Sequence, residues 1–142
     1  MPAAIEELIR FSSPVPHATF RVTTETMKLA GLEIPAHEQV LICLGAANHD
    51  PDFYDDPAVL DISREPRPHL GFGHGIHFCL GASLARLEAQ IAFGVLLDRF
   101  PDLELAVDRH GLSWTHGDGL VLRGLAELPV RLGMPRRGAP SV

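Results

Sequence analysis

The sequence predicts an α+β chain in which helices dominate and the strands are short. Three observations support this class. Residues 82–99 carry apolar side chains on nearly every face of a helix. Short apolar stretches elsewhere are bounded by turn-forming residues, as strands are. The 13 glycines and 12 prolines among 142 residues indicate much irregular chain that is fixed by turns.

Composition and charge exclude several function classes. Hydrophobic residues make up 46% of the chain and charged residues 21%, which is typical of soluble globular proteins rather than disordered ones. The net charge of −6 disfavours binding to nucleic acid or to an anionic membrane. The apolar runs are too short to span a bilayer, and two cysteines do not form a disulfide framework. We therefore expect a soluble, cytoplasmic protein.

Two helices are predicted. The first covers residues 3–11, where apolar residues recur on one helical face and Pro14 follows. The second covers residues 82–99 and is ended by Pro101. Because apolar side chains extend almost all round this second helix, we expect it to be mostly buried.

Several short stretches have the composition of strands. They are residues 18–22, 26–29, 38–44, 103–107, 120–123 and 128–132. Segment 38–44 is strongly apolar, so we expect it to form a buried strand.

The chemistry is concentrated at the end of the irregular segment 48–81, which is rich in Pro, Asp, His and Gly. An irregular stretch of this length is usually functional or disordered, and its apolar residues argue against disorder. Cys79 lies directly before the second predicted helix, whose N-terminal N–H groups and dipole stabilise a thiolate. Gly73, Gly75 and Gly81 let a flat ligand approach the backbone. A shielded thiolate of this kind suits an axial iron ligand.

Two other interpretations apply to these residue types. His74, His77 and Cys79 all carry metal-ligating atoms, but no CxxC or HxxxH pair accompanies them, so a zinc site is the weaker hypothesis. An isolated cysteine is most often a small buried apolar residue. We interpret Cys43, inside the apolar segment 38–44, in that way.

The complete pattern, F-x-x-G-x-x-x-C-x-G, resembles the haem-binding loop of cytochromes P450. The residues that carry it are Phe72, Gly73, Gly75, His77, Cys79 and Gly81. The stretch Glu7-Leu8-Ile9-Arg10 is similar to the E-x-x-R of the family's K helix. IPAHEQVLICLGAANHDP and DISREPRPHLGFGHG resemble the following strand and the meander, and Leu128-Pro129-Val130 is similar to part of the C-terminal hairpin.

The resemblance implies the C-terminal part of the P450 fold: K helix, short β strands, meander, Cys-ligand loop, L helix and C-terminal β hairpin. Residues 1–133 would form the haem-binding C-terminal portion of an incomplete domain, and residues 134–142 a flexible tail. A complete member of the family is much longer, so the resemblance covers only its C-terminal third.

The resemblance also assigns site residues. The implied cofactor is haem b (iron protoporphyrin IX), with Cys79 as the axial ligand of the iron. Arg21 and His77 match positions that hold the haem propionates, and the planar guanidinium of an arginine suits a carboxylate. The alternative for Arg21 is a solvated strand residue. Phe72 and the three loop glycines complete the implied cofactor site.

A structural cluster is implied as well. Glu7 and Arg10 lie one helical turn apart and share a face, although a surface pair of this kind stabilises little. In the family the pair is buried with an arginine from the meander, which here would be Arg64. Arg67 and His69 either stabilise the meander or are exposed, and the sequence does not distinguish these alternatives.

No catalytic residue is identified, because the family's central helix with its acid–alcohol pair has no counterpart among these residues. Thr23-Thr24-Glu25 is the nearest string, but it lies in a strand pattern. The residues that match parts of a substrate pocket are His17, Ala18, Thr19, Val121 and Leu122. They do not define a substrate.

The implied activity is haem-dependent monooxygenation of a small organic substrate, with electrons from a ferredoxin- or flavodoxin-type partner. Arg67 and Arg86 are candidates for docking that acidic donor. Because the chain opens almost directly on the E-x-x-R helix, we expect a frame begun inside a longer one, a gene remnant, or a half completed by a complementing N-terminal chain. We expect the isolated chain to lack turnover. The alternative function is a non-catalytic haem-binding module or an inactive remnant.

Overall fold

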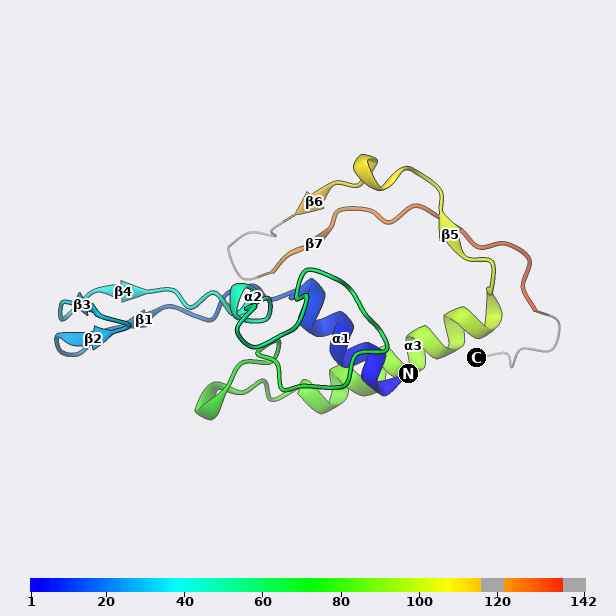
Figure 1. The fold of residues 1–142 in the computed structure, drawn as a ribbon. Helices are drawn as coiled ribbons and strands as arrows, with labels where there is room; N and C mark the ends of the chain where they lie inside the picture. Colours follow the sequence, from blue (N-terminus) through cyan, green and yellow to red (C-terminus); the bar gives the residue numbers. More distant parts are fainter. Residues whose placement is uncertain (116–121, 137–142) are drawn as a thin grey trace.

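A computed structural model describes residues 1–115 and 122–136 of the chain. Two helices, α1 (Pro2–Ser12) and α3 (Ala82–Arg99), pack against each other at the centre. One set of short strands projects from one end, and a long C-terminal arc runs above α3 (Figure 1). The predicted α+β class is confirmed.

Helix α1 extends the predicted range by one residue at each end. Pro2 occupies its first turn, where a missing N–H is tolerated. Ser13 ends it in the left-handed conformation, at φ 39°, and donates its backbone N–H to the Ile9 carbonyl at 3.0 Å. The buried residues of the helix are Ile5, Glu7 and Arg10. Hydrogen bonds from Arg10 to the Asn48 and Pro57 carbonyls join the helix to the segments that follow.

The N-terminal strands form two antiparallel pairs. Strand β1 (Arg21–Val22) pairs with β4 (Gln39–Val40), and β2 (Met27–Leu29) pairs with β3 (Leu32–Ile34). Ala30 and Gly31 connect β2 to β3 with φ values of 48° and 82°. Two consecutive positive φ values are typical of the type I′ turn, whose twist matches that of a two-residue hairpin.

The remaining elements are short. Strand β5 (Glu104–Leu105) pairs with β8 (Val130–Arg131), and β6 (Trp114–Thr115) pairs with β7 (Gly124–Leu125). The other short helices are α2 (Leu44–Ala47), η1 (Gly75–His77) and η2 (Arg109–Gly111). Each described sheet has two strands.

The prediction of a buried strand over residues 38–44 was wrong. Strand β4 covers only two of these residues, and Leu44 already begins α2. Cys43 is exposed, not buried. The physical reason is that, within residues 1–115 and 122–136, β4 pairs with β1 alone and no second layer covers this apolar segment. Half of the strand predicted over residues 120–123 lies outside the described residues; residues 122 and 123 are not in a strand, and β7 begins just beyond them.

The predicted bounds of α3 are confirmed, but its predicted burial was wrong. Ala82 is the buried residue of this helix, whereas Leu84, Leu87 and Ile91 are 59%, 54% and 58% exposed. Periodicity reports which side chains are apolar and not what covers them. Among the described elements, α1 provides the main contact with α3, so most of its apolar surface faces outward.

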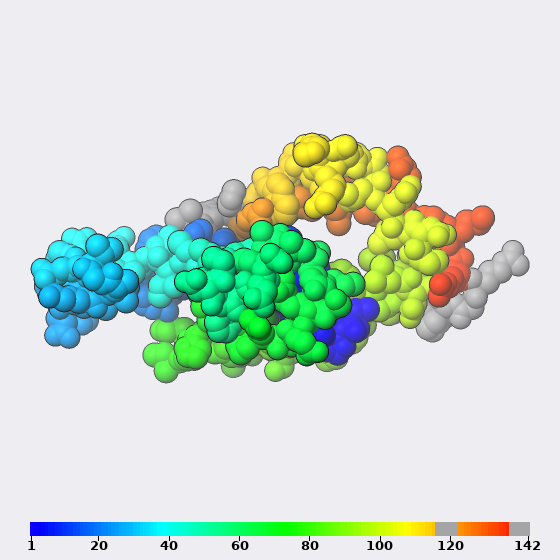
Figure 2. Space-filling model, in the orientation of Figure 1, coloured from blue at the N-terminus to red at the C-terminus, as the bar shows by residue number. Residues whose placement is uncertain are grey.

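The core lies where α1 and α2 meet the irregular segment 48–70. Figure 2 shows this segment packed over α1 in the middle of the molecule. Asn48 is 1% exposed; its Oδ1 accepts the Leu70 N–H at 2.7 Å, and its Nδ2 donates to Ser13 Oγ at 3.0 Å. This core depends on hydrogen bonds as well as apolar contact, and it positions the loop that leads to Cys79.

Candidate functional site

The thiolate loop, residues 72–81, places Cys79 just before the first turn of α3. The Cys79 N–H donates to the Phe72 carbonyl at 2.8 Å, and its own carbonyl accepts the Ala82 N–H at 3.2 Å. Both backbone groups of the cysteine are therefore fixed, while the residue is exposed. The loop holds a thiol in place without covering it.

Two glycines give the loop its shape. Gly73 and Gly75 have φ values of +74° and +66°, a region that residues with a side chain rarely adopt. Gly73 donates to the Leu70 carbonyl at 2.9 Å, and the Gly75 carbonyl accepts the Phe78 N–H at 3.1 Å. A Cβ at Gly81 would meet Cys79 Sγ at 3.9 Å, an ordinary contact. Gly73 and Gly75 are thus required for the backbone conformation, and Gly81 is not.

Apolar groups accompany the thiol. The rings of Phe72 and Phe78 lie 6.3 Å apart between centroids. Phe78, Ile76 and Leu80 are all exposed, the last two almost completely. Exposed apolar side chains beside an accessible sulfur are typical of a ligand surface rather than of a solvated loop.

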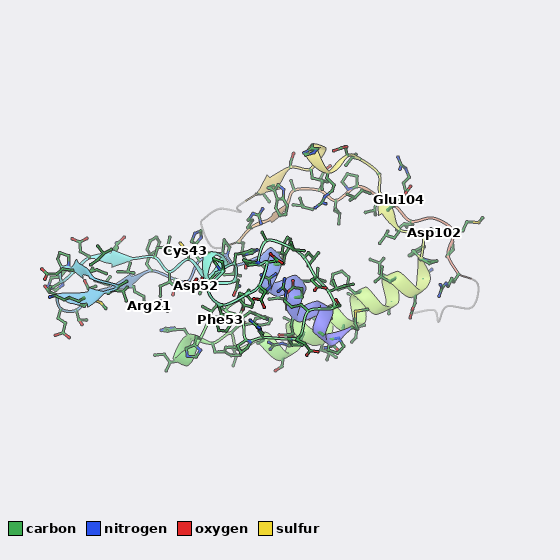
Figure 3. The ribbon with its side chains drawn as sticks, in the orientation of Figure 1. Arg21, Cys43, Asp52, Phe53, Asp102 and Glu104 are labelled. Carbon is green, nitrogen blue, oxygen red and sulfur yellow. The ribbon has the colours of Figure 1, made fainter. Side chains whose placement is uncertain are left out.

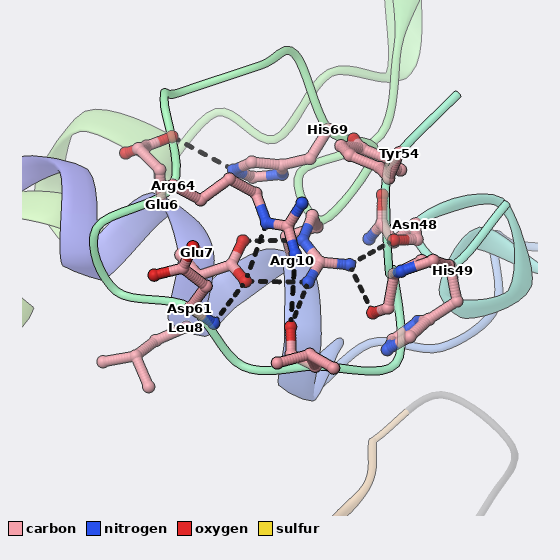
Figure 4. Close-up of polar contacts among 12 residues, drawn as sticks. Glu6, Glu7, Leu8, Arg10, Asn48, His49, Tyr54, Asp61, Arg64 and His69 are labelled. Atoms are coloured by element: carbon pink, nitrogen blue, oxygen red, sulfur yellow. Dashed lines mark hydrogen bonds and ion pairs between the residues drawn. The ribbon is translucent and has the colours of Figure 1, made fainter. Parts of the chain in front are cut away.

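The structure brings Glu7, Arg10 and Arg64 together (Figure 4). Arg10 donates from Nε to Glu7 Oε2 at 2.7 Å and from Nη2 to Oε1 at 2.8 Å. Arg64 Nε donates to the same Oε1 at 3.3 Å. Arg10 also donates from Nη1 to the Asn48 carbonyl at 2.7 Å. The cluster therefore joins α1 to two parts of the irregular segment.

Burial and charge act against each other in this cluster. Burial raises the pKa of Glu7, but hydrogen bonds from Arg10 and from the Asp61 N–H outweigh it and leave that pKa below its ordinary value. The hydrogen bonds to Glu7 likewise raise the pKa of Arg10. Among the described residues, every buried side-chain nitrogen and oxygen has a hydrogen-bond partner. The cluster is thus an ionised and fully bonded centre.

A second cluster was not predicted from the sequence. Glu6 accepts from Arg86 Nε at 2.6 Å and from Nη2 at 2.9 Å, and it contacts His69 Nε2 at 3.0 Å. The Arg86 guanidinium lies over the Phe72 ring, 4.5 Å from its centroid. These partners are far apart in sequence and follow no motif. The sequence signal is the adjacent pair Glu6 and Glu7 in the first predicted helix, of which Glu7 belongs to the E-x-x-R pattern.

For Arg67 and His69 the sequence predicts either a role in stabilising the meander or an exposed position, and the structure differs between the two residues. The His69 side chain is buried, at 4% exposed, and bonds to α1 through Glu6. Arg67 is half exposed but donates to the Phe53 carbonyl at 2.7 Å. Both residues therefore hold the irregular segment. Arg86 is occupied by Glu6 and Phe72 instead of being presented mainly to solvent.

The two predicted propionate residues belong to different elements, β1 and η1. Arg21 lies in β1, within the group of short strands β1–β4 that projects from one end of the molecule (Figure 3). It donates from Nη1 to the Thr19 carbonyl and hydroxyl at 2.8 and 2.5 Å. His77 ends η1 and is exposed. Arg21 also borders an open, mostly apolar groove of about 420 Å³ that includes Met27 and Val40. This group of strands thus presents the Arg21 guanidinium beside an apolar surface.

The predicted pocket residues lie in two places. His17, Ala18 and Thr19 lie between α1 and β1, where Ala18 donates to the Ile42 carbonyl at 2.9 Å. Leu122 is exposed, and Val121 lies outside the described residues. The string Thr23-Thr24-Glu25 follows β1 and is not in a strand. The Thr23 hydroxyl donates to the Pro35 carbonyl at 2.6 Å, which gives it a structural role.

Within residues 1–115 and 122–136, no group of three or more His, Cys, Asp and Glu side chains is placed to hold a metal ion. No described helix is both long and apolar enough to cross a bilayer.

Comparison with known proteins places the chain in a family. Residues 1–122 match the family model described as Cytochrome P450. Cytochrome P450 107B1 of Saccharopolyspora erythraea is 52% identical over 133 residues, which are 94% of this chain and 32% of that protein. The 6-deoxyerythronolide B hydroxylase of the same species is 44% identical over 132 residues, 93% of this chain and 32% of the hydroxylase.

Solved structures agree. The tirandamycin C-bound P450 monooxygenase TamI matches with a TM-score of 0.88 and 52% identity, over 92% of this chain and 32% of TamI. CxnD, a P450 enzyme for C–S bond formation in chuangxinmycin biosynthesis, matches with a TM-score of 0.88 and 47% identity, over 95% and 33%. The chain spans about a third of the length of the relatives it matches. It belongs to the cytochrome P450 family.

Proposed function

We propose that residues 1–133 are the haem-binding C-terminal portion of a cytochrome P450 monooxygenase, with Cys79 as the axial ligand of the iron of haem b. The observation that carries this proposal is the geometry of Cys79. Its backbone is fixed on both sides, at 2.8 Å to Phe72 and 3.2 Å to Ala82, while the residue remains exposed before α3.

The residues of the thiolate loop fit a haem. A single soft thiolate is the ligand that this class of haem iron uses, and the loop offers one accessible sulfur. Gly73 and Gly75 hold positive φ values without a Cβ that would block a flat ligand. Phe78 and Ile76 expose apolar surface that a porphyrin would cover. When bound, the haem supplies the activation of dioxygen for insertion of one oxygen atom into an organic substrate.

Arg21 and His77 are proposed to hold the propionates. Arg21 uses Nη1 for Thr19, and a guanidinium carries further N–H groups on Nε and Nη2 in a planar fork that matches a carboxylate. His77 lies two residues before Cys79 and is exposed. Two N–H-donating side chains, one from β1 and one from η1, would orient the porphyrin at its polar edge.

The substrate is proposed to be a small organic molecule, and the electron donor a ferredoxin- or flavodoxin-type protein. His17, Ala18, Thr19, Val121 and Leu122 would contribute to the substrate pocket. Because Arg86 is engaged by Glu6, Arg67 is the better candidate for contact with an acidic donor.

We further propose that the isolated chain binds haem without turning over substrate. The observation that favours this non-catalytic state is the exposure of Cys79 and of the apolar side chains beside it. A haem held only by the thiolate loop would face water on its other side, and water competes with productive oxygen chemistry. A haem-dependent product from the purified chain with NAD(P)H and a redox partner would contradict this proposal.

The test of the ligand uses the two cysteines as a matched pair. Both are exposed and free. The full chain is reconstituted with haem, reduced and exposed to carbon monoxide, and the Soret band typical of thiolate ligation is recorded. We expect Cys79→Ala to abolish this band and Cys43→Ala to retain it. A thiolate band that persists in Cys79→Ala would refute the assignment.

A further inference from the structure

A series of contacts that begins on α1 holds the N-terminal end of the thiolate loop in place. Glu6 contacts His69 Nε2 at 3.0 Å, and His69 Nδ1 accepts the Gly71 N–H at 3.0 Å. Gly71 precedes Phe72, whose carbonyl accepts the Cys79 N–H at 2.8 Å. The His69 ring thus connects a carboxylate on a helix to the backbone that holds the cysteine.

These contacts define the protonation of the ring. A nitrogen that accepts a backbone N–H carries no proton, so Nδ1 is bare and Nε2 carries the hydrogen that is donated to Glu6. A doubly protonated ring would place an N–H against the Gly71 N–H. Of the two neutral tautomers, only the Nε2–H form satisfies both contacts. The chain of hydrogen bonds therefore requires His69 in one defined state.

Two further contacts close the framework. Arg86, on α3, holds Glu6 with two hydrogen bonds and stacks over Phe72. Gly71 fills the remaining space: a Cβ there would lie 2.6 Å from Ile9 Cγ2 and 3.1 Å from His69 Nδ1. The loop entrance is thus fixed between α1 and α3 with no room for a side chain. Hydrogen bonds from Arg86 lower the pKa of Glu6 despite its partial burial, so the acceptor stays ionised.

We propose that His69, as a neutral Nε2–H ring, is a positioning residue that orients the Cys79 ligand through Gly71 and Phe72, and that Arg86 completes the fastening from α3. This proposal rests on the proposed role of Cys79 as the haem ligand. Neither residue would itself be a ligand of the iron. Their effect is to restrict the backbone from which the thiolate extends.

The first measurement requires no haem. In the full chain labelled with ¹⁵N-histidine, NMR identifies the tautomer of His69, and hydrogen exchange reports the protection of the Gly71 and Cys79 amides. We expect the Nε2–H tautomer. We also expect His69→Phe, which keeps a ring but no nitrogen, to increase exchange at both amides by about tenfold, the factor expected when one net hydrogen bond is lost.

Conservative variants separate the two ends of the ring. In His69→Asn the side-chain oxygen replaces Nδ1 as an acceptor for Gly71, and in His69→Gln the amide nitrogen replaces Nε2 as a donor to Glu6. We expect His69→Asn to restore protection at Gly71 and at Cys79, and His69→Gln not to. His110→Gln, at an exposed histidine of η2, is the control and should behave as the wild type. These milder variants keep the test decisive if His69→Phe fails to fold.

The second measurement uses the haem-loaded chain. We expect His69→Phe to lower the fraction of the reduced carbon monoxide complex that shows the thiolate band. An Nδ1–H tautomer, or unchanged exchange at Cys79 in the folded His69→Phe and His69→Gln variants, would overturn the positioning role. Absence of a thiolate band in the wild type would instead refute the proposed function, and the tautomer and exchange results would still decide what His69 does to the loop.

Discussion

Arg10 shows at the scale of one residue how this chain keeps its fold. The residue is 2% exposed, and its guanidinium donates to Glu7, to the Asn48 carbonyl and to the Pro57 carbonyl. It also lies 5.0 Å from the centre of the Tyr54 ring. A buried cation is costly unless each of its donors is matched. Arg10 therefore fixes the path of the irregular segment around α1.

Glu7→Gln should be strongly destabilising. The variant leaves Arg10 and Arg64 without their carboxylate, and breaking a buried ion pair on one side costs about 3–5 kcal/mol. Urea unfolding followed by circular dichroism gives the change in the free energy of unfolding. The matched control is Glu104→Gln, which removes a pair with Arg131 whose side chains are 64% and 62% exposed; it should cost less than about 1 kcal/mol. Equal effects of the two variants would show that the cluster does not hold the fold.

The stability of the chain should fall at acidic pH through Glu6 and Glu7. Hydrogen bonds from Arg86 lower the pKa of Glu6; for Glu7, burial opposes the shift, but hydrogen bonds from Arg10 prevail. Because both folded pKa values lie below the ordinary 4.5, the stabilisation is complete above that pH and is lost as the pH falls through the folded values. Urea unfolding from neutral pH to about pH 3 measures the loss.

Glu6→Gln provides the check on that pH dependence. The variant removes one of the two titrating groups, so its free energy of unfolding should decrease less steeply below pH 4.5 than that of the wild type. A wild-type slope in Glu6→Gln would mean that Glu6 titrates normally in the folded chain.

The residue scale also shows what sequence can predict of the site. Glu7, Arg10 and Arg64 were expected together because a family motif names them, and the structure joins them. Glu6, His69 and Arg86 follow no such motif, and Glu6 and Arg86 are 80 positions apart. Side-chain partners at that separation are determined by how the elements pack, which a single sequence does not specify.

Helix α3 shows the same difference, between what a sequence predicts and what packing determines, at the scale of an element. Its bounds could be predicted because apolar and helix-forming residues fill it up to Pro101. Its burial could not, because burial depends on the neighbouring elements. The buried strand predicted over residues 38–44 was wrong for the same reason: its apolar residues suit a covered strand, yet in the part of the chain that the structure describes β4 pairs with β1 alone. An apolar segment indicates that burial would be favourable, but it does not show whether another element buries it.

Gly94→Ala should stabilise α3. Gly94 lies within the helix, and a Cβ there would meet nothing within 4 Å. Alanine restricts the unfolded chain and is the better helix former, so we expect a gain of about 0.5–1 kcal/mol. Thermal unfolding followed by circular dichroism measures it. Gly75→Ala is the contrasting variant, since Gly75 also has open space but a φ of +66°; it should destabilise by about 1–2 kcal/mol. A loss of stability in Gly94→Ala would indicate that α3 is covered in solution.

The whole molecule is more open than its size requires. Its accessible surface is 10674 Å², whereas a compact monomer of 15.5 kDa exposes roughly 7,000 Å². In residues 1–115 and 122–136, the buried apolar side chains are Ile5, Leu44, Tyr54 and Ala82. The surplus surface includes the apolar stripe of α3. Surfaces of this kind are sites of association with other chains.

The isolated chain should therefore bind a hydrophobic dye and self-associate in a concentration-dependent way. Replacing two residues of the exposed stripe, as in Leu87→Gln with Ile91→Gln, should reduce dye fluorescence and shift analytical ultracentrifugation towards the monomer. The double variant should cost little stability, because these side chains are more than half exposed. Ile5→Gln is the contrasting change: Ile5 is 1% exposed, so this variant should lose several kcal/mol and increase dye binding. If the double variant unfolded the chain as Ile5→Gln does, the outward face of α3 would be part of the core, and the open arrangement described above would be wrong.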